Sequence, residues 1–171
     1  DAVDKGPPVH QRGRHRRPRP AAGGADFSFL EYSSPAACYA ALDDYFSSME
    51  ALVPRADLYD VLGHIIYPLR YMLPTVTLDR YMDRLAHILR TAISLGRGIE
   101  VNTYRGKSIE EWRPLLALYR SLGGEFVTTG ADAHLPGSVG LGIPAALELL
   151  RETGFSYFTV YEKRRPVQIK L

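Results

Sequence analysis

The chain carries the stretch GGEFVTTGADAH at residues 123–134. Its apolar, β-branched centre, flanked by glycines, predicts a short buried strand. Asp132 and His134 follow at the carboxyl end of this strand, the end where α/β sheets keep their chemistry. If the strand geometry continues, residues two apart point to the same side, so a carboxylate and an imidazole would face a divalent cation together. An aspartate that only caps the next turn is the simpler alternative.

Two earlier stretches also predict buried strands that end in polar residues. Residues 58–66 form an apolar run that ends near His64, and residues 98–103 place Glu100 and Asn102 on one side. A lone histidine in an apolar run is usually a core residue. An inward glutamate in a strand covered on both faces needs a cation, an arginine or backbone amides as its partner. Because parallel strands end at one edge, these side chains predict a shared metal or phosphate site.

Helical spacing of apolar residues alternates with the predicted strands. We expect helices at residues 35–53, 78–95, 108–122 and 143–153, and a closing hairpin over residues 155–169. Residues 26–32 are expected as a short strand or an extended loop, and Cys38 as a buried core residue. The alternation of helices and strands predicts an α/β protein built from parallel βαβ units.

Loops at the same edge carry arginine and glycine. Arg70 lies between aromatic residues, where it could bind a phosphate with its forked guanidinium or stack on Tyr71. Arg105 lies in a basic loop after the strand at residues 98–103. The glycine-rich loop at residues 136–142 lacks the Gly-Lys-Ser/Thr ending of a Walker loop. It either lets a helix amino terminus approach the site or serves as a flexible connection.

Composition limits the classes of protein to which the chain can belong. The 171 residues are 46% hydrophobic and 23% charged, which is ordinary for one globular domain. There is no apolar run of 18 residues and no apolar signal segment, so neither a membrane partner nor secretion is predicted. The single cysteine excludes a disulfide within the chain and fits a reducing compartment, so we expect a cytoplasmic protein.

Residues 1–24 differ from the rest of the chain. They are rich in Pro, Gly and Arg, so we expect a disordered basic tail followed by one domain over residues 25–171. The tail holds six basic and two acidic residues, a net charge of +4, which leaves 15 basic and 17 acidic residues and a net charge of −2 for the remainder. The arginine run could bind RNA, but no aromatic residue is interleaved for stacking and the body is acidic. Both features argue against a nucleic-acid partner.

Several motifs together resemble one known family. The segments are YDVLGHIIYPLRY at residues 59–71, GIEVNT at residues 98–103 and GADAH at residues 130–134, and FTVYEKRRPV at residues 158–167 resembles the family's carboxyl terminus. Their order and spacing resemble the histidinol-phosphatase branch of the PHP (polymerase and histidinol phosphatase) metal-dependent phosphoesterases. The resemblance covers about residues 25–171.

The resemblance implies a fold, a site and a reaction. The fold would be the carboxyl-terminal half of a distorted (β/α)7 TIM-like barrel, with metal ions at its carboxyl rim. The implied roles are metal ligation by His64, Asp132 and His134, the last two being catalytic; support by Glu100 and Asn102; and binding of the substrate phosphate by Arg70 and Arg105. The implied reaction is hydrolysis of L-histidinol phosphate to L-histidinol and phosphate in histidine biosynthesis. His and carboxylate ligands suit zinc, manganese or iron alike.

The chain also departs from the family pattern. It has no His-x-His motif, which in the family lies on the first strand, and family members extend further at the amino end. We therefore expect a fragment, one chain of a split protein, or a translation that enters its proper frame near Gly24. The alternative function is a non-catalytic half-barrel or assembly subunit with at most one weak metal or phosphate site. An open half-barrel has an unpaired sheet edge, so its expected partners are a second copy or the missing amino-terminal half.

Overall fold

The computed structural model describes residues 15–16 and 26–171. The expected disorder of residues 1–24 lies outside the described residues, except at positions 15–16. The strands are β1 (His15–Arg16), β2 (Val61–Leu62), β3 (Gly98–Asn102), β4 (Val127–Gly130), β5 (Tyr157–Glu162) and β6 (Arg165–Lys170). The α-helices are α1 (Pro35–Leu52), α2 (Met82–Ser94), α3 (Arg113–Ser121) and α4 (Ile143–Glu152). The expected helices and the closing hairpin are thus present.

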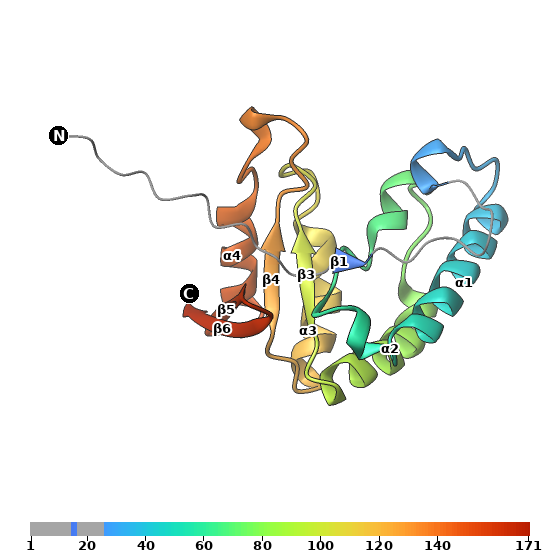
Figure 1. The fold of residues 1–171 in the computed structure, drawn as a ribbon. Coiled ribbons are helices and arrows are strands. Elements are labelled where there is room, and N and C mark those ends of the chain that lie inside the picture. The colour runs from blue at the N-terminus through green and yellow to red at the C-terminus, as the bar shows by residue number, and fades with distance from the viewer. Residues whose placement is uncertain (1–14, 17–25) are drawn as a thin grey trace.

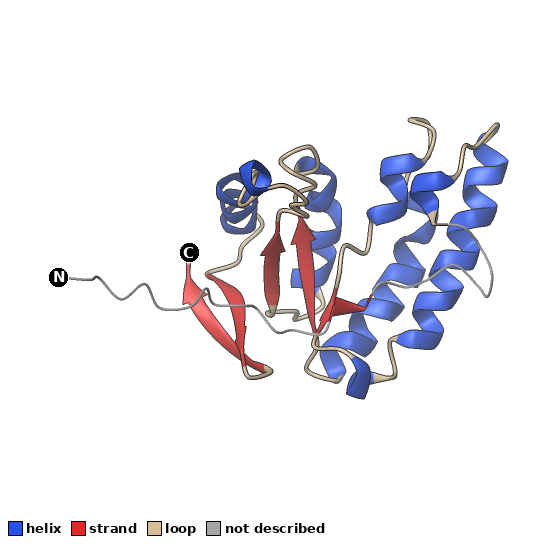
Figure 2. Cartoon of the chain, turned by 45° about the horizontal axis from the view of Figure 1, so that its top comes forward, coloured by secondary structure: helices blue, strands red, loops and turns tan. Residues whose placement is uncertain are grey.

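A parallel sheet in the order β1-β2-β3-β4 forms the centre, and β5 and β6 form a separate antiparallel hairpin. Helices α1 and α2 lie together on the β2 side, whereas α3 and α4 lie beside β3 and β4 (Figure 1; Figure 2). The register pairs Ile99 with Val127 and Asn102 with Gly130, so β3 and β4 end at the same level. The predicted α/β class with parallel strands is confirmed.

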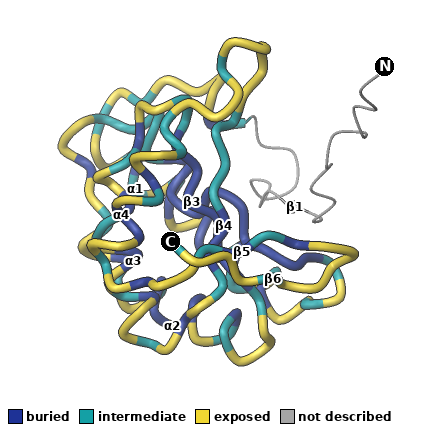
Figure 3. Tube along the Cα trace, turned by 90° about the vertical axis from the view of Figure 1, so that its left-hand side faces the viewer, coloured by how far each residue is buried: buried dark blue, intermediate teal, exposed yellow. Residues whose placement is uncertain are grey.

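The core lies between the sheet and its helices. Strand β3 and the first half of β4 are buried at the centre of the chain trace, and the outer loops are largely exposed (Figure 3). All five residues of β3 are buried, which is typical of a parallel strand with both faces covered. Helix α1 begins where the Ser34 hydroxyl accepts a hydrogen bond from Ala37 N at 3.3 Å. Cys38 is fully buried on this helix, as expected.

Two elements of the structure differ from the elements predicted from the sequence. Residues 26–32 form neither a strand nor a wholly extended loop, because Phe27–Phe29 is a 3-10 turn that Asp26 caps by accepting a hydrogen bond from Ser28 N. The strand predicted at residues 58–66 is reduced to Val61–Leu62. It ends early because His64 has φ 31°, which is incompatible with extended backbone.

The hairpin is fastened to the amino end of the sheet by Asp60. This carboxylate is 1% exposed and accepts hydrogen bonds from Arg97 Nη1 at 3.2 Å and from Arg164 Nε at 3.0 Å. The Tyr161 hydroxyl donates to Asp60 O at 3.3 Å. The Asp60 carboxylate therefore joins the start of β2 to the hairpin about 100 positions later in the chain. In the described part of the chain, none of the helices is both long and apolar enough to cross a membrane.

Candidate functional site

The carboxyl ends of β2, β3 and β4 form a rim of unusual backbone. Four of the six non-glycine residues with positive φ among those described lie there: His64 at 31°, Tyr104 at 47°, Arg105 at 58° and Asp132 at 53°. Such conformations are costly for residues with a Cβ atom, and they concentrate at functional sites. In Figure 1 the arrowheads of β3 and β4 point towards the loops that carry these residues. The rim is therefore the candidate site on backbone geometry alone.

Glu100 is the buried centre of the rim. Its Oε2 accepts a hydrogen bond from His64 N at 3.1 Å, which joins the end of β2 to β3. The Asn102 amide lies 3.5 Å from the same oxygen. Gly130 leaves the space for this carboxylate, because a Cβ at that position would lie 2.2 Å from Glu100 Oε1. The partner expected for an inward glutamate is thus a backbone amide.

Arg70 lies across the rim and links β3 to β4. Its Nη2 donates to Asn102 Oδ1 at 2.6 Å, and its Nη1 donates to Asp132 Oδ2 at 3.1 Å. Its guanidinium carbon lies 4.3 Å from the centre of the Tyr104 ring and 5.4 Å from that of Tyr67. The guanidinium therefore binds two protein groups and stacks on Tyr104 and Tyr67, and the predicted stacking on Tyr71 is wrong.

Asp132 and His134 do not emerge from a strand side by side. Strand β4 ends at Gly130, and the positive φ of Asp132 breaks the alternation on which that prediction depended. His134 is exposed, and its Nδ1 lies 2.8 Å from the carbonyl oxygen of Asp132. The two residues remain neighbours because of a turn.

A hollow of about 390 Å³ opens at the rim. Its lining combines carboxylates, hydroxyls, an arginine and a histidine: Asp26, Ser28, Phe29, Tyr67, Tyr71, Tyr104, Arg105, Asp132 and His134. The Nε atom of Arg105 is buried there without a hydrogen-bond partner in the described residues. A buried guanidinium N–H without an acceptor suits an anionic ligand.

A smaller hollow of about 200 Å³ shares Tyr104 with the larger one. It is lined by Ile66, Leu69, Arg70, Tyr104, Lys107, Ser108 and Glu111. Arg70 and Arg105 therefore line different hollows, although both stack on the ring of Tyr104, at 4.3 and 4.5 Å. The two predicted phosphate-binding arginines are connected through one aromatic ring.

The predicted site residues fall into two groups. Arg105, Asp132 and His134 share the larger hollow, whereas His64, Glu100 and Asn102 are buried beneath the rim. Within residues 15–16 and 26–171, no three His, Cys, Asp or Glu side chains gather closely enough to hold a metal ion. The rim as arranged here does not fit a metal ion, because Asp132 already has a cationic partner in Arg70.

Several residues of the site were not predicted from the sequence. The Tyr67 hydroxyl donates to Asp26, and burial followed by this hydrogen bond raises the pKa of Tyr67 above its ordinary value. Tyr104 stacks on both arginines, and Trp112 donates from Nε1 to Asn102 O at 3.0 Å directly behind the rim. The aromatic residues flanking Arg70 were the one available signal, since the other contacts join segments distant in sequence.

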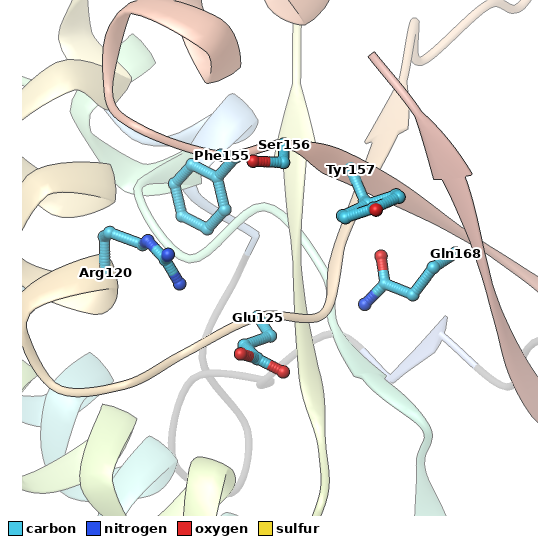
Figure 4. Close-up of a pocket in the computed structure, with 6 residues that line it drawn as sticks. All are labelled: Arg120, Glu125, Phe155, Ser156, Tyr157 and Gln168. Carbon is cyan, nitrogen blue, oxygen red and sulfur yellow. The ribbon is translucent and has the colours of Figure 1, made fainter.

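A further hollow of about 310 Å³ lies at the opposite, amino end of β4. Figure 4 shows Arg120, Glu125, Tyr157 and Gln168 around it, between α3 and the hairpin. These side chains are exposed, and none of the predicted site residues lies there. The polar, strained rim is the stronger candidate.

The fold and the rim define an α/β protein with a polar site at the carboxyl ends of parallel strands. No protein-family model matches the chain. A probable histidinol-phosphatase of Clostridium acetobutylicum is 32% identical over 111 residues, which are 61% of this chain and 44% of the relative. A probable histidinol-phosphatase of Thermotoga maritima is 30% identical over 132 residues, 75% of this chain and 54% of the relative.

A solved structure shows the same fold. It is the Lactococcus lactis histidinol phosphate phosphatase, whose crystals hold zinc, L-histidinol and phosphate. The TM-score is 0.70 at 24% identity, and the match covers 84% of this chain and 55% of that one. The chain is thus a relative of the histidinol-phosphatases, which confirms the relationship predicted from its motifs. It spans about half the length of the relatives it matches.

Proposed function

We propose that the chain provides the carboxyl-terminal part of a metal-dependent phosphomonoesterase of the histidinol-phosphatase type. Its substrate would be L-histidinol phosphate, which is hydrolysed to L-histidinol and phosphate. The observation that carries the proposal is the rim itself, where Arg105, Asp132 and His134 line one hollow on a fold similar to that of the Lactococcus enzyme. We further propose a cytoplasmic setting, as for an enzyme of histidine biosynthesis.

The sheet would be part of a distorted (β/α)7 barrel of the PHP type, with residues 25–171 as one partial domain. Its parallel strands and polar carboxyl rim support this assignment. The metal ion, with zinc, manganese and iron as candidates, would take Asp132, His134 and His64 as ligands together with donors from a segment that corresponds to the unmatched part of the relatives. That segment, or a second copy of the chain, would be the assembly partner.

The anion-binding part of the proposal rests on this chain alone. Arg105 offers a buried Nε without a partner in the described residues, and the tyrosines Tyr71 and Tyr104 line the same hollow. These donors would orient the phosphate group, and the aromatic surface of Phe29 would face the remainder of the substrate. Glu100 and Asn102 would support the rim from beneath.

A non-catalytic half-barrel with one weak phosphate site is the second candidate. It is favoured by the ion pair between Arg70 and Asp132, which uses a carboxylate that the phosphatase would need as a metal ligand. The two candidates share phosphate binding and differ in turnover after assembly.

The test measures binding first and turnover second. We expect L-histidinol phosphate to bind the purified chain in calorimetric titration, and Arg105→Gln to weaken binding about tenfold, as for one charge-assisted hydrogen-bond partner. The control is Arg90→Gln on the exposed face of α2, with unchanged affinity. Absence of binding to the folded wild type would refute both candidates.

Turnover then separates the candidates. The chain is mixed with the part of the Thermotoga maritima relative that it does not match and with Mn²⁺, and phosphate release from L-histidinol phosphate is measured. Release by the mixture above that of either part supports the phosphatase. Binding of the substrate without release in the mixture supports the non-catalytic half-barrel.

A further inference from the structure

The hollow at the amino end of β4 lies between α3 and the hairpin and has a backbone frame of its own. On the α3 side, Gly124 N donates a hydrogen bond to Tyr119 O at 2.9 Å. On the hairpin side, Leu171 N donates to Ser156 O at 3.0 Å. The segments that carry the lining residues are therefore held by backbone hydrogen bonds next to the hollow.

Aromatic rings form the apolar part of the lining. Phe155 is 6% exposed, and its ring stacks on that of Tyr119, with ring centres 6.4 Å apart and an angle of 19° between the planes. Tyr157, the first residue of β5, lines the same hollow and is 47% exposed. The volume of about 310 Å³ is near the lower end of the range of about 300–1,000 Å³ for small-molecule pockets. A small ligand with a planar group would therefore suit this lining.

Two opposite charges line the hollow without neutralising each other. They are Arg120, in the last turn of α3, and Glu125, two residues before β4. Within the described part of the chain, neither side chain forms an ion pair. In Figure 4 the guanidinium of Arg120 and the amide of Gln168 point towards each other from opposite sides of the hollow. The guanidinium and the carboxylate are therefore both available to a ligand.

The balance of charge decides the class of ligand. The lining carries one guanidinium and one carboxylate, so a phosphate group would be repelled by Glu125 and an organic cation by Arg120. A zwitterion offers a carboxylate to the fork of the arginine and an ammonium group to the glutamate, so that each charge gains a partner.

We propose that this hollow binds a free α-amino acid with a planar side chain. The carboxylate of the amino acid pairs with Arg120, its ammonium group pairs with Glu125, and its side chain lies against the rings of Phe155 and Tyr157. The hollow shares no lining residue with the hollow at the rim, so this second site does not depend on the proposed function.

The experiment titrates the full-length, isotope-labelled chain with L-histidine and follows the backbone amide signals by NMR. L-Histidine has a planar ring and differs from L-histidinol only by a carboxylate in place of the hydroxymethyl group. We expect the signals of residues 123–125 and 155–157 to shift. L-Histidinol should bind there at least about fivefold more weakly, because it offers no anion to Arg120. L-Alanine should also bind at least about fivefold more weakly, because it lacks the ring.

Three variants assign the contacts. Arg120→Gln should remove the preference for L-histidine over L-histidinol, since the partner of the carboxylate is gone. Glu125→Gln should weaken the binding of both ligands at least about threefold and keep the preference. Arg90→Gln, on the exposed face of α2, is the control and should behave as wild type. The comparison of ligands on the wild type tests the proposal even if a variant fails to fold.

The outcomes separate this site from the rim. The inference is overturned if millimolar L-histidine leaves the signals of residues 123–125 and 155–157 unchanged, or if L-histidine and L-histidinol bind there equally well. Shifts confined to residues 132–134 and weakened by Arg105→Gln would place the amino acid at the rim and overturn the inference too. Binding of L-histidinol phosphate is measured separately, so either proposal can fail while the other stands.

Discussion

The backbone amide of His64 and the carboxylate of Glu100 are joined at 3.1 Å, so the end of β2 is held by a side chain of β3. Both residues are at least nine-tenths buried. The hydrogen bond stabilises the positive φ of His64, and it fixes the level at which the two strands end. The carboxylate of Glu100 therefore helps to hold the rim together from beneath the hollow.

Removing the Glu100 carboxylate should destabilise the fold. Glu100→Ala takes away the acceptor of a buried amide, so we expect a loss of about 1–3 kcal/mol in the free energy of unfolding. Urea denaturation of both proteins measures it. Glu148→Ala is the control, since Glu148 is exposed and pairs only locally with Arg151; its effect should stay within about 0.5 kcal/mol. Equal stabilities of Glu100→Ala and wild type would contradict the role of Glu100.

Gly130→Ala should be destabilising for a steric reason. The added Cβ would lie 2.2 Å from Glu100 Oε1, and the overpacking should cost about 1–3 kcal/mol. Gly137→Ala is the matched control, because a Cβ added at Gly137 would have nothing within 4 Å. In the double variant with Glu100→Ala the clash is absent. Its loss of unfolding free energy should therefore be smaller than the sum of the losses of the two single variants. Strict additivity in thermal or urea denaturation would refute the proposed contact.

Asp60→Asn should loosen the hairpin. The variant keeps the shape but removes the charge shared by Arg97 and Arg164, whose side chains are 24% and 44% exposed. We expect a loss of about 2–4 kcal/mol, less than for a wholly buried pair because water reaches the arginines. Asp57→Asn, at an exposed carboxylate 3.8 Å from Arg55, is the control. Hydrogen exchange should show faster exchange in β5 and β6 for Asp60→Asn alone.

The stability contributed by the pair of Glu50 and Arg84 should depend on pH. The hydrogen bond from Arg84 lowers the pKa of Glu50 below its ordinary value. The contribution is therefore complete above the ordinary pKa of glutamate and is lost as the pH falls through the lowered pKa. Arg84→Gln should cost about 0.5–1 kcal/mol at neutral pH and almost nothing once the pH lies below the lowered pKa of Glu50, where the carboxylate is protonated.

The control for this pH dependence is Arg90→Gln, an exposed residue of the same helix. Its effect on the free energy of unfolding should be small at every pH. A cost of Arg84→Gln that stays constant or grows on acidification would contradict the predicted sign.

Truncation of residues 1–24 should expose a sheet edge. It removes β1, whose residues 15–16 pair with Val61 and Leu62 of β2. An uncovered edge favours pairing between chains, so light scattering should show stronger self-association of the truncated protein. Its affinity for phosphate should be unchanged, because the lining residues of the hollow that the structure describes begin at Asp26. A truncated protein that stays as monodisperse as the full chain would contradict this role of β1.

Local patterns were sufficient to predict the secondary structure around the rim. The five-residue strand β3 and the inward Glu100 follow from apolar alternation, and helix α1 follows from Ser34 and Pro35 at its start. Residues 58–66 were predicted as too long a strand, because apolar composition does not reveal that His64 bends the backbone to positive φ.

The contacts of the site were predicted less well because they are tertiary. Arg70 was recognised as a forked donor, but its acceptors lie 32 and 62 residues further along the chain. Asp60 was taken only as part of a strand, because its partner Arg164 lies 104 residues away. Asp132 and His134 were correctly placed at the end of a strand, but the turn at Asp132 could not be inferred from spacing two residues apart.

Trp112 is the one tryptophan of the chain, and its indole N–H donates to the backbone oxygen of Asn102, whose side-chain oxygen accepts a hydrogen bond from Arg70. Its fluorescence is therefore an intrinsic optical reporter for the rim. A ligand that shifts Asn102 alters the hydrogen bond of the indole and with it the emission maximum. Ligand screening and stopped-flow kinetics on this chain need no added dye.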